Sequence, residues 1–188
     1  MSAVAEVLHA LREVFERRGV GWYLFGAQAV AVRGAPRATQ DVDVTVQVHR
    51  SELTALAADL ERAGIEHRYP TLADELLRSG AVLPLRHSAS GLEIDLVLAG
   101  SGLEALALQR ARPASVDGVE VPVASATDLV VMKILAGRGK DLDDVRSLLA
   151  GGEVDLDEVR DLLGQLEEAL GQSDLLSALD AAIRATHR

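Results

Sequence analysis

Three aspartates among the first 95 residues of the chain have the type and spacing of metal ligands. Asp41 and Asp43 are one residue apart and open a segment in which valines alternate with polar residues. Side chains at positions i and i+2 of a strand lie on the same face, roughly 7 Å apart along the chain. Asp95 lies on the polar face of a second predicted strand, Leu92–Leu98. We therefore expect all three carboxylates on one sheet face if the two strands are neighbours.

Such a group of carboxylates predicts a site for divalent cations. Clustered carboxylates repel one another and are costly unless cations neutralise them. Hard oxygen ligands favour Mg²⁺ or Mn²⁺, and two such ions about 4 Å apart serve phosphoryl transfer. Asp-x-Asp alone is not specific, because the chain contains it at 41/43, 141/143 and 155/157. An acidic, solvated strand face is the alternative interpretation.

A glycine upstream of the aspartate pair adds a phosphate site to this hypothesis. Trp22–Phe25 predicts a short strand, Gly26 and Ala27 follow it, and Ala27–Val32 predicts one or two helical turns. A strand–glycine–helix arrangement points backbone N–H groups toward an anion. The alternative is a glycine that only allows a tight turn. Next to the carboxylate pair, Gly26 and Ala27 are predicted to hold phosphates.

The elements around these residues predict an α/β (α+β) fold with a mixed sheet flanked by helices. Hydrophobic periodicity and turn residues predict the strands and helices. Strands are expected at 22–25, 42–48, 81–87, 92–98, 114–116 and 119–123, with a hairpin turn at Asp117-Gly118. Helices are expected at 4–15, 51–63, 103–110, 126–136, 141–149, 155–170 and 173–185, with weaker signals from 65 to 80. We expect an α/β domain at 1–124 and a helical C-terminal segment, 125–188, packed on it.

The composition restricts the classes of partner. A net charge of −10 argues against general nucleic-acid binding, so a polyanion must meet a local basic patch or metal-screened carboxylates. The absence of cysteine excludes disulfides and thiolate metal sites. The longest uncharged stretch, 20–32, is shorter than the roughly 20 residues of a membrane-spanning helix. No signal sequence opens the chain, so we expect a cytoplasmic protein without a membrane partner.

The order of these motifs resembles the polymerase-β-like nucleotidyltransferase superfamily. In that superfamily a strand, a Gly-[Gly/Ser/Ala] pair and a short helix precede an Asp-x-Asp strand and a later strand with a lone Asp. Here residues 28–40 separate Gly26-Ala27 from Asp41. The segments Phe25–Asp43 and Asp128–Asp144 are similar to bacterial minimal and AbiEii-type nucleotidyltransferases. The resemblance covers about residues 20 to 150.

The resemblance implies transfer of a nucleoside monophosphate from an NTP to an acceptor, with release of pyrophosphate. It implies that Asp41, Asp43 and Asp95 hold Mg²⁺ or Mn²⁺, and that Asp95 helps to deprotonate the acceptor hydroxyl. Gly26 and Ala27 would hold the phosphates. Many active members have Ser or Gly at the position of Ala27, which keeps the backbone N–H and lacks a hydroxyl. The implied acceptors are tRNA, a protein or a small molecule.

Three further residues receive accessory roles from the same resemblance. Lys133 would neutralise triphosphate charge, Arg37 would be a second phosphate contact, and Asp141 matches a helical acid near the site. The alternative for Lys133 is a lysine that reaches solvent from an apolar helix. The alternative for Asp141 is an exposed helix start with ion pairs, which also includes Arg138, Lys140, Asp143 and Asp144.

Three other interpretations stand beside active nucleotidyl transfer. The chain is also compatible with a catalytically silent nucleotide- or partner-binding protein, or with a toxin held inactive by an antitoxin partner. Asp41-Val-Asp-Val-Thr45 also resembles the opening motif of haloacid-dehalogenase-type phosphatases. In those enzymes the nucleophilic aspartate ends an apolar strand, whereas here the valines follow the pair, so this topology does not match.

Overall fold

A computed structural model describes residues 1–34, 41–100 and 102–186 of the protein. Their contacts divide the chain into two compact units. The first unit comprises Met1–Gln28 and Ala38–Ala124, and the second comprises Ala29–Arg37 and Ser125–Arg188. The boundary between the units runs through helix α2, Gly26–Arg33. The assignment of 1–124 to one domain and 125–188 to another stays a prediction.

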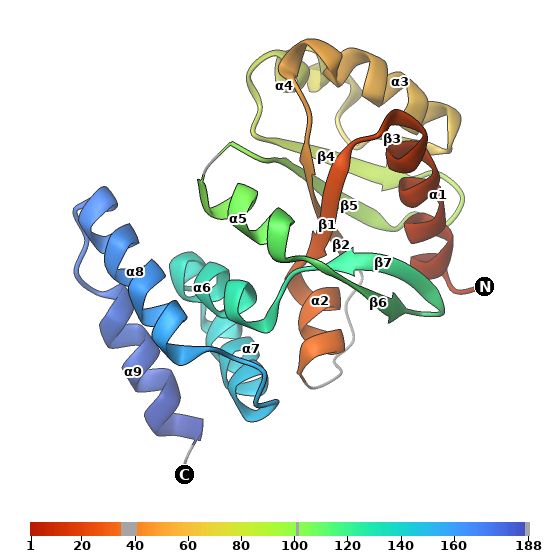
Figure 1. Ribbon diagram of the computed structural model, residues 1–188. Coiled ribbons are helices and arrows are strands. Elements are labelled where there is room, and N and C mark those ends of the chain that lie inside the picture. Colours follow the sequence, from red (N-terminus) through yellow and green to blue (C-terminus); the bar gives the residue numbers. More distant parts are fainter. Residues whose placement is uncertain (35–40, 101, 187–188) are drawn as a thin grey trace. The chain divides into compact units, whose positions relative to one another are not determined.

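Within the described residues, the first unit contains one seven-stranded mixed sheet in the order β3-β4-β5-β2-β1-β7-β6 (Figure 1). The strands are β1 (Gly21–Phe25), β2 (Asp41–Gln47), β3 (Ile65–His67), β4 (Val82–His87), β5 (Glu93–Leu98), β6 (Arg112–Val116) and β7 (Val119–Val123). The β2/β5 and β1/β7 pairs are parallel, and the other neighbours are antiparallel. The α/β class expected from the sequence is thus confirmed.

The sheet contains two hairpins, β4–β5 and β6–β7, and the second is the one predicted at Asp117-Gly118. In the second, Asp117 and Gly118 have φ angles of 49° and 83°. A two-residue hairpin turn of this kind needs positive φ at both central positions, which is why Asp-Gly is a strong turn signal.

The helices of the first unit are α1 (Ala3–Arg18), α3 (Leu53–Arg62), α4 (Ala73–Ser79) and α5 (Gly102–Arg110), with short 3₁₀ turns η1 (Arg50–Glu52) and η2 (Pro70–Leu72). In α1 and α3 the buried residues, most of them apolar, recur on one side of the helix. Ser2 caps α1 by accepting a hydrogen bond from the Ala5 N–H, and Gly19 ends the helix in the left-handed region. The helix expected to begin at residue 51 begins at Leu53 as α3, and residue 51 belongs to the 3₁₀ turn η1 that precedes it.

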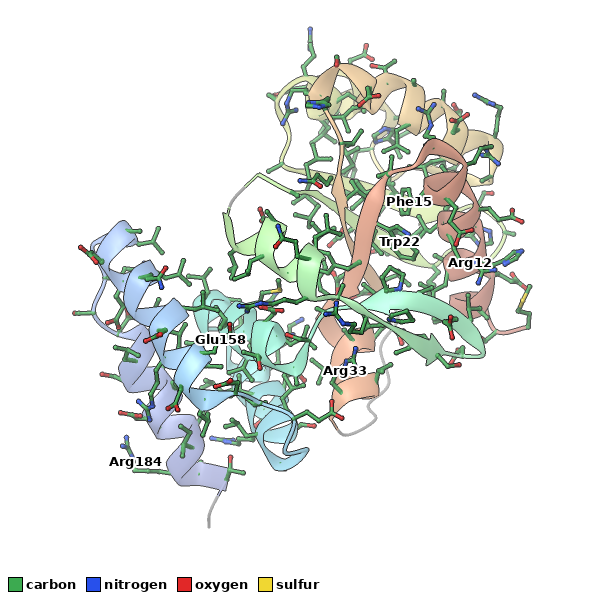
Figure 2. All side chains as sticks on the ribbon, in the orientation of Figure 1. Arg12, Phe15, Trp22, Arg33, Glu158 and Arg184 are labelled. Atoms are coloured by element: carbon green, nitrogen blue, oxygen red, sulfur yellow. The ribbon has the colours of Figure 1, made fainter. Side chains whose placement is uncertain are left out.

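The sheet has two unlike faces, and this difference positions the candidate site. Phe15 of α1 lies beside Trp22 of β1, with ring centroids 5.2 Å apart (Figure 2). Strand alternation and register place a set of fully buried side chains on this helix-covered face: Leu24, Val42, Val44, Val46, Leu83, Leu85, Ile94 and Leu96. The carboxylates of β2 and β5 alternate with these residues, so they lie on the opposite face.

The second unit confirms the predicted all-helical C-terminal segment. Its helices are the Ala29–Arg33 part of α2 together with α6 (Ala126–Ala136), α7 (Gly139–Ala150), α8 (Leu156–Leu170) and α9 (Leu175–Thr186). Ser125 caps α6 by accepting a hydrogen bond from the Asp128 N–H. Leu129, Val145, Leu163 and Leu179 are fully buried between these helices. In the described part of the chain, none of the helices has the length and apolar character needed to span a bilayer.

Candidate active site

The strand register brings Asp43 and Asp95 together. In the parallel β2/β5 pair Asp43 is the register partner of Asp95, and Asp41 is the partner of Glu93. Neighbouring strands lie about 4.8 Å apart, and register partners point to the same face. The two carboxylates therefore stand side by side, as expected from the two polar strand faces. The catalytic and metal-binding roles of the three aspartates stay predictions.

The carboxylates of this face are open to solvent to different degrees. Asp41 is exposed and Asp43 is half-buried. The side chains of Glu93 and Asp95 are 53% and 44% exposed. Partial exposure at a sheet surface leaves room for a ligand to approach Asp43 and Asp95 while the strands fix their spacing.

Gly26 lies directly against the side chain of Asp43. Phe25 is the register partner of Asp43, so the next residue begins α2 beside the carboxylate. A Cβ atom at Gly26 would lie 1.9 Å from Asp43 Oδ2, and the φ angle of Gly26 is +65°. Only glycine meets both conditions without strain or collision. The tight-turn and phosphate-binding interpretations of Gly26 are thus compatible, because the turn itself presents the start of α2 at Asp43.

The first turn of α2 offers backbone donors at this place. The first four N–H groups of a helix have no partner within the helix and form a region of positive potential. Ala27 is 8% exposed and continues the helix from Gly26. The N–H groups at the start of α2 can therefore contribute to an anion site bordered by Asp43. Phosphate binding at Gly26 and Ala27 stays a prediction.

Arg68 is the cation in contact with Asp95. Its Nη1 donates to Glu93 Oε2 at 2.5 Å, and its Nη2 donates to Asp95 Oδ1. The Arg68 side chain is 17% exposed, less than either carboxylate. Sequence reasoning missed Arg68, because it follows a three-residue strand in a stretch with weak periodicity.

The donor set fits a hard divalent cation in its chemistry, since the carboxylate oxygens of Asp43 and Asp95 are the ligands that Mg²⁺ and Mn²⁺ prefer. Across residues 1–34, 41–100 and 102–186, however, no three His, Cys, Asp or Glu side chains are grouped as metal ligands. One oxygen of Asp95 is engaged by Arg68. A metal ion bound through that oxygen would require Arg68 to move.

Lys133 and Asp141 lie in the second unit, where they contact each other. Lys133 Nζ lies 3.0 Å from Asp141 Oδ1 and 2.7 Å from Asp144 Oδ2. Lys133, Asp141 and Asp144 are 7%, 0% and 3% exposed. The two alternatives from the sequence, a lysine that reaches solvent and an exposed acidic helix start, are therefore wrong for these three residues. Their accessory roles stay predictions.

Hydrogen bonds determine the ionisation of Asp141. Burial alone would raise the pKa of its carboxyl group, but hydrogen bonds from Arg138 and Lys133 hold the pKa below its usual range. Arg138 Nε donates to Asp141 Oδ2 at 2.6 Å. Asp141 thus stays ionised at neutral pH. Arg37, the other predicted phosphate contact, lies outside the described residues.

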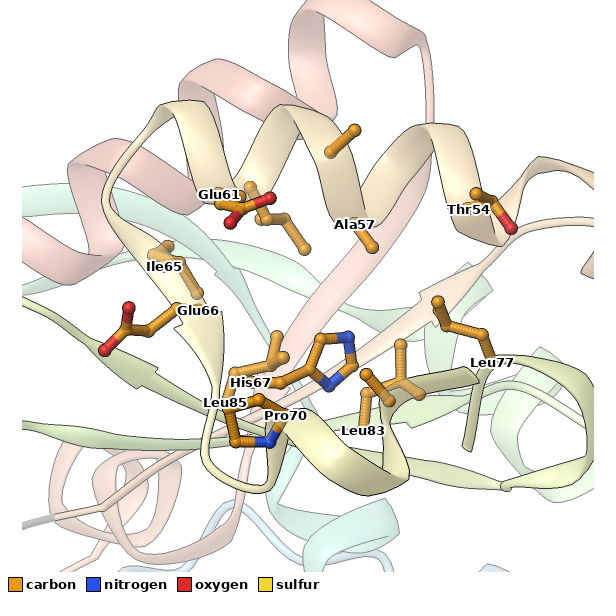
Figure 3. A pocket seen from close by; sticks show the side chains of 13 residues that line it. Thr54, Ala57, Glu61, Ile65, Glu66, His67, Pro70, Leu77, Leu83 and Leu85 are labelled. Atoms are coloured by element: carbon orange, nitrogen blue, oxygen red, sulfur yellow. The ribbon is translucent and has the colours of Figure 1, made fainter. Parts of the chain in front are cut away.

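A cavity lies on the opposite, helix-covered face of the sheet, between α3, β3 and α4. Its volume is about 360 Å³, and its lining includes Ile65, His67, Leu77 and Leu83 (Figure 3). Both ring nitrogens of His67 are buried without a hydrogen-bond partner. Loss of hydration lowers the pKa of His67, against a smaller opposing effect of Glu61. His67 is therefore a neutral component of the apolar layer behind the carboxylates.

Comparison with known proteins supports the expected family. A family model described as "Nucleotidyltransferase of unknown function (DUF6036)" matches residues 2–176. No curated protein matches the chain.

Several solved structures share the fold. A solution structure of the antibiotic-resistance factor ANT(2″)-Ia has a TM-score of 0.63 at 14% identity, covering 91% of this chain and 95% of that one. A crystal structure of ANT(2″)-Ia in complex with adenylyl-2″-tobramycin has a TM-score of 0.62 at 15% identity, covering 90% and 99%. An antigenic nucleotidyltransferase-like protein from Paracoccidioides brasiliensis has a TM-score of 0.52 at 20% identity, covering 95% and 91%.

Proposed function

Because the chain belongs to the DUF6036 family of nucleotidyltransferases, we propose that it transfers a nucleoside monophosphate from an NTP to an acceptor hydroxyl. The observation that carries this proposal is the position of Asp43, in register with Asp95 and in contact with the turn at Gly26. The carboxylates proposed to hold metal ions and the backbone N–H groups proposed to bind phosphates thus adjoin each other within one unit.

The residues would divide the reaction between them. The acceptor oxygen bonds to the α-phosphorus, the bond to the β-phosphate breaks, and pyrophosphate leaves. Asp41, Asp43 and Asp95 would hold the cations, and Asp95 would accept the proton of the acceptor hydroxyl. Backbone N–H groups at Gly26 and Ala27 would bind phosphate oxygens. Bound Mg²⁺ or Mn²⁺ would supply charge neutralisation of the triphosphate and of the attacking and leaving oxygens.

The charge of the chain favours one class of acceptor. A net charge of −10 is unfavourable for a polyanion such as RNA and favourable for a cationic small molecule. The structurally similar ANT(2″)-Ia was crystallised with adenylyl-2″-tobramycin, an adenylylated small molecule. We therefore place a small, amine-bearing alcohol first among the acceptors, ahead of tRNA and protein.

A catalytically silent nucleotide-binding protein is the second candidate. The observation that favours it is the contact between Arg68 and Asp95, which occupies an oxygen of the predicted metal ligand. A silent protein would bind an NTP without releasing pyrophosphate. A toxin silenced by an antitoxin would instead become active when purified away from its partner.

Transfer of label from NTPs radiolabelled at the α-phosphate tests the proposal. Each NTP is incubated with Mg²⁺ and tobramycin, total RNA or cell extract, and we expect labelled product with at least one acceptor. Asp43→Asn should reduce the label about a thousandfold, a loss typical of removed transition-state electrostatics. Asp143→Asn is the matched control, because Asp143 belongs to another Asp-x-Asp pair and its side chain is 76% exposed. Equal activity of Asp43→Asn and wild type would reject the proposed site.

A further inference from the structure

Arg68 reaches the carboxylates from two strands away. Its backbone N–H donates to the Pro84 carbonyl at 2.9 Å, and Pro84 is the register partner of Asp95. Two strand spacings separate β3 from β5, roughly 10 Å. The Arg68 side chain therefore crosses β4 to reach Glu93 and Asp95. Arg68, Pro84, Asp95 and Asp43 lie in one row across the sheet, so the guanidinium lies in the same row as the two aspartates.

The guanidinium bridges two carboxylates as a bound cation would. One nitrogen meets Glu93 and a second nitrogen meets Asp95. Arginine stays charged at every accessible pH, so loss of a proton cannot release these carboxylates. A metal ion can use the engaged oxygen of Asp95 only after the guanidinium has moved.

The arrangement leaves one polar atom of Arg68 without a partner. The Nε atom is buried and has no hydrogen bond. A buried donor without an acceptor carries a desolvation cost that a different side-chain position can remove. Phosphate oxygens are acceptors that suit the geometry of a guanidinium. A triphosphate could therefore offer Arg68 a hydrogen-bond acceptor for Nε that its present partners do not supply.

We propose that Arg68 is the resting counter-ion of Asp95 and that nucleotide and metal binding displace it together. The inference rests on the proposed function, because it assigns Arg68 to the same metal and triphosphate site. Without nucleotide, Arg68 competes with the metal ion for Asp95 and weakens its binding. With an NTP bound, the guanidinium gains phosphate partners, and Asp95 becomes available to the metal ion and to the acceptor proton.

Mn²⁺ binding, measured by the electron paramagnetic resonance signal of the free ion, tests this competition without any catalytic readout. Arg68→Gln should bind Mn²⁺ roughly tenfold more tightly than wild type in the absence of nucleotide, because a competing charge-assisted hydrogen bond is lost. The same variant should bind a non-hydrolysable NTP analogue with Mg²⁺ more weakly by isothermal titration calorimetry. Unchanged Mn²⁺ affinity in a folded Arg68→Gln protein overturns the inference.

Arg86→Gln is the matched control for the general effect of removing a positive charge. Arg86 is the register partner of Glu93 and pairs with Glu66 at 2.8 Å, and its side chain is 50% exposed. Its loss should change the Mn²⁺ affinity by less than about threefold, since screened surface charges act weakly. Equal gains from Arg68→Gln and Arg86→Gln would show a charge effect alone and overturn the inference.

Glu93→Gln decides the question if Arg68→Gln does not fold. It keeps Arg68 and removes one of its two partners, so displacement predicts tighter Mn²⁺ binding although the face loses a negative charge. Weaker Mn²⁺ binding overturns the inference. Failure of the proposed function would be recognised by a different result. In that case Asp43→Asn and Asp95→Asn would leave Mn²⁺ binding unchanged, both in the wild-type protein and in the Arg68→Gln variant.

Discussion

Two charged clusters of this protein contain the same kinds of side chain in opposite surroundings. In the first unit Arg68 meets Glu93 and Asp95, whose side chains are about half exposed. In the second unit Lys133 meets Asp141 and Asp144, and all three are almost completely buried. Exposed ion pairs contribute little to stability, whereas a buried charge without its partner is very costly. The first cluster can therefore exchange its cation, and the second is held in one arrangement.

The comparison separates two meanings of a carboxylate in a motif. Asp141 matches a helical acid of the resembled family, and its oxygens accept hydrogen bonds from Lys133 and Arg138. Asp43 adjoins the backbone turn at Gly26 on an accessible sheet face. A ligand can be exchanged on such a face, whereas Asp141 is part of the capping box that begins α7.

The largest expected effect is the loss of stability in Lys133→Met. The substitution keeps the length of the side chain and leaves Asp141 and Asp144 buried without the ammonium group. We expect the free energy of unfolding to fall by about 3–5 kcal/mol, as measured by urea denaturation. Lys140→Met is the matched control, because Lys140 is exposed and is the other lysine of the chain. A loss below about 1 kcal/mol in Lys133→Met would remove the distinction between the two clusters.

Gly26→Ala should give the next largest effect, now at the accessible cluster. The new Cβ collides with Asp43 Oδ2, and a φ of +65° is unfavourable for alanine. We expect the free energy of unfolding to fall by about 1–3 kcal/mol. The Mn²⁺ affinity should also fall, because Asp43 must move. Gly171→Ala is the control: it has the same φ with open space around it. Equal Mn²⁺ affinity of the two variants would contradict the role of the Gly26–Asp43 contact.

The carboxylates of the first cluster could be predicted from the sequence, whereas the cations and the burial of the second cluster could not. Period-2 alternation fixes which strand residues share a face, so Asp43 and Asp95 were predicted on one face before their register was known. The strand–glycine–helix order identified Gly26 as a turn residue, and the structure adds its positive φ angle. The cations were different: Arg68 lies 27 residues before Asp95 in the chain and reaches it across β4. No local pattern encodes such a tertiary contact, nor the burial of Lys133 by the surrounding helices.

A smaller effect is expected for the stability of Arg68→Gln. Its partners are about half exposed, so removal of the guanidinium leaves carboxylates that water can solvate. We expect the unfolding free energy to change by less than about 1 kcal/mol in thermal or urea denaturation. A loss as large as that of Lys133→Met would mean that Arg68 is a structural residue. The Arg68 cluster would then not differ from the Lys133 cluster in its contribution to stability.

The smallest expected effect concerns His67, on the apolar face behind the carboxylates. Burial lowers the pKa of His67 in the folded protein, whereas the unfolded chain protonates it near the ordinary value of 6.5. The unfolded state therefore binds more protons as the pH falls below that value, so the protein loses stability on acidification and keeps it above. His67→Phe retains a ring in the cavity and removes the titration, so its melting temperature should fall less between pH 7.5 and 5.5. Taking the difference between wild type and His67→Phe removes the contribution of the other histidines to the pH dependence. The Mn²⁺ affinity of the variant at pH 7.5 should equal that of wild type. A changed Mn²⁺ affinity would mean that the two faces of the sheet are coupled through β3, where His67 adjoins Arg68.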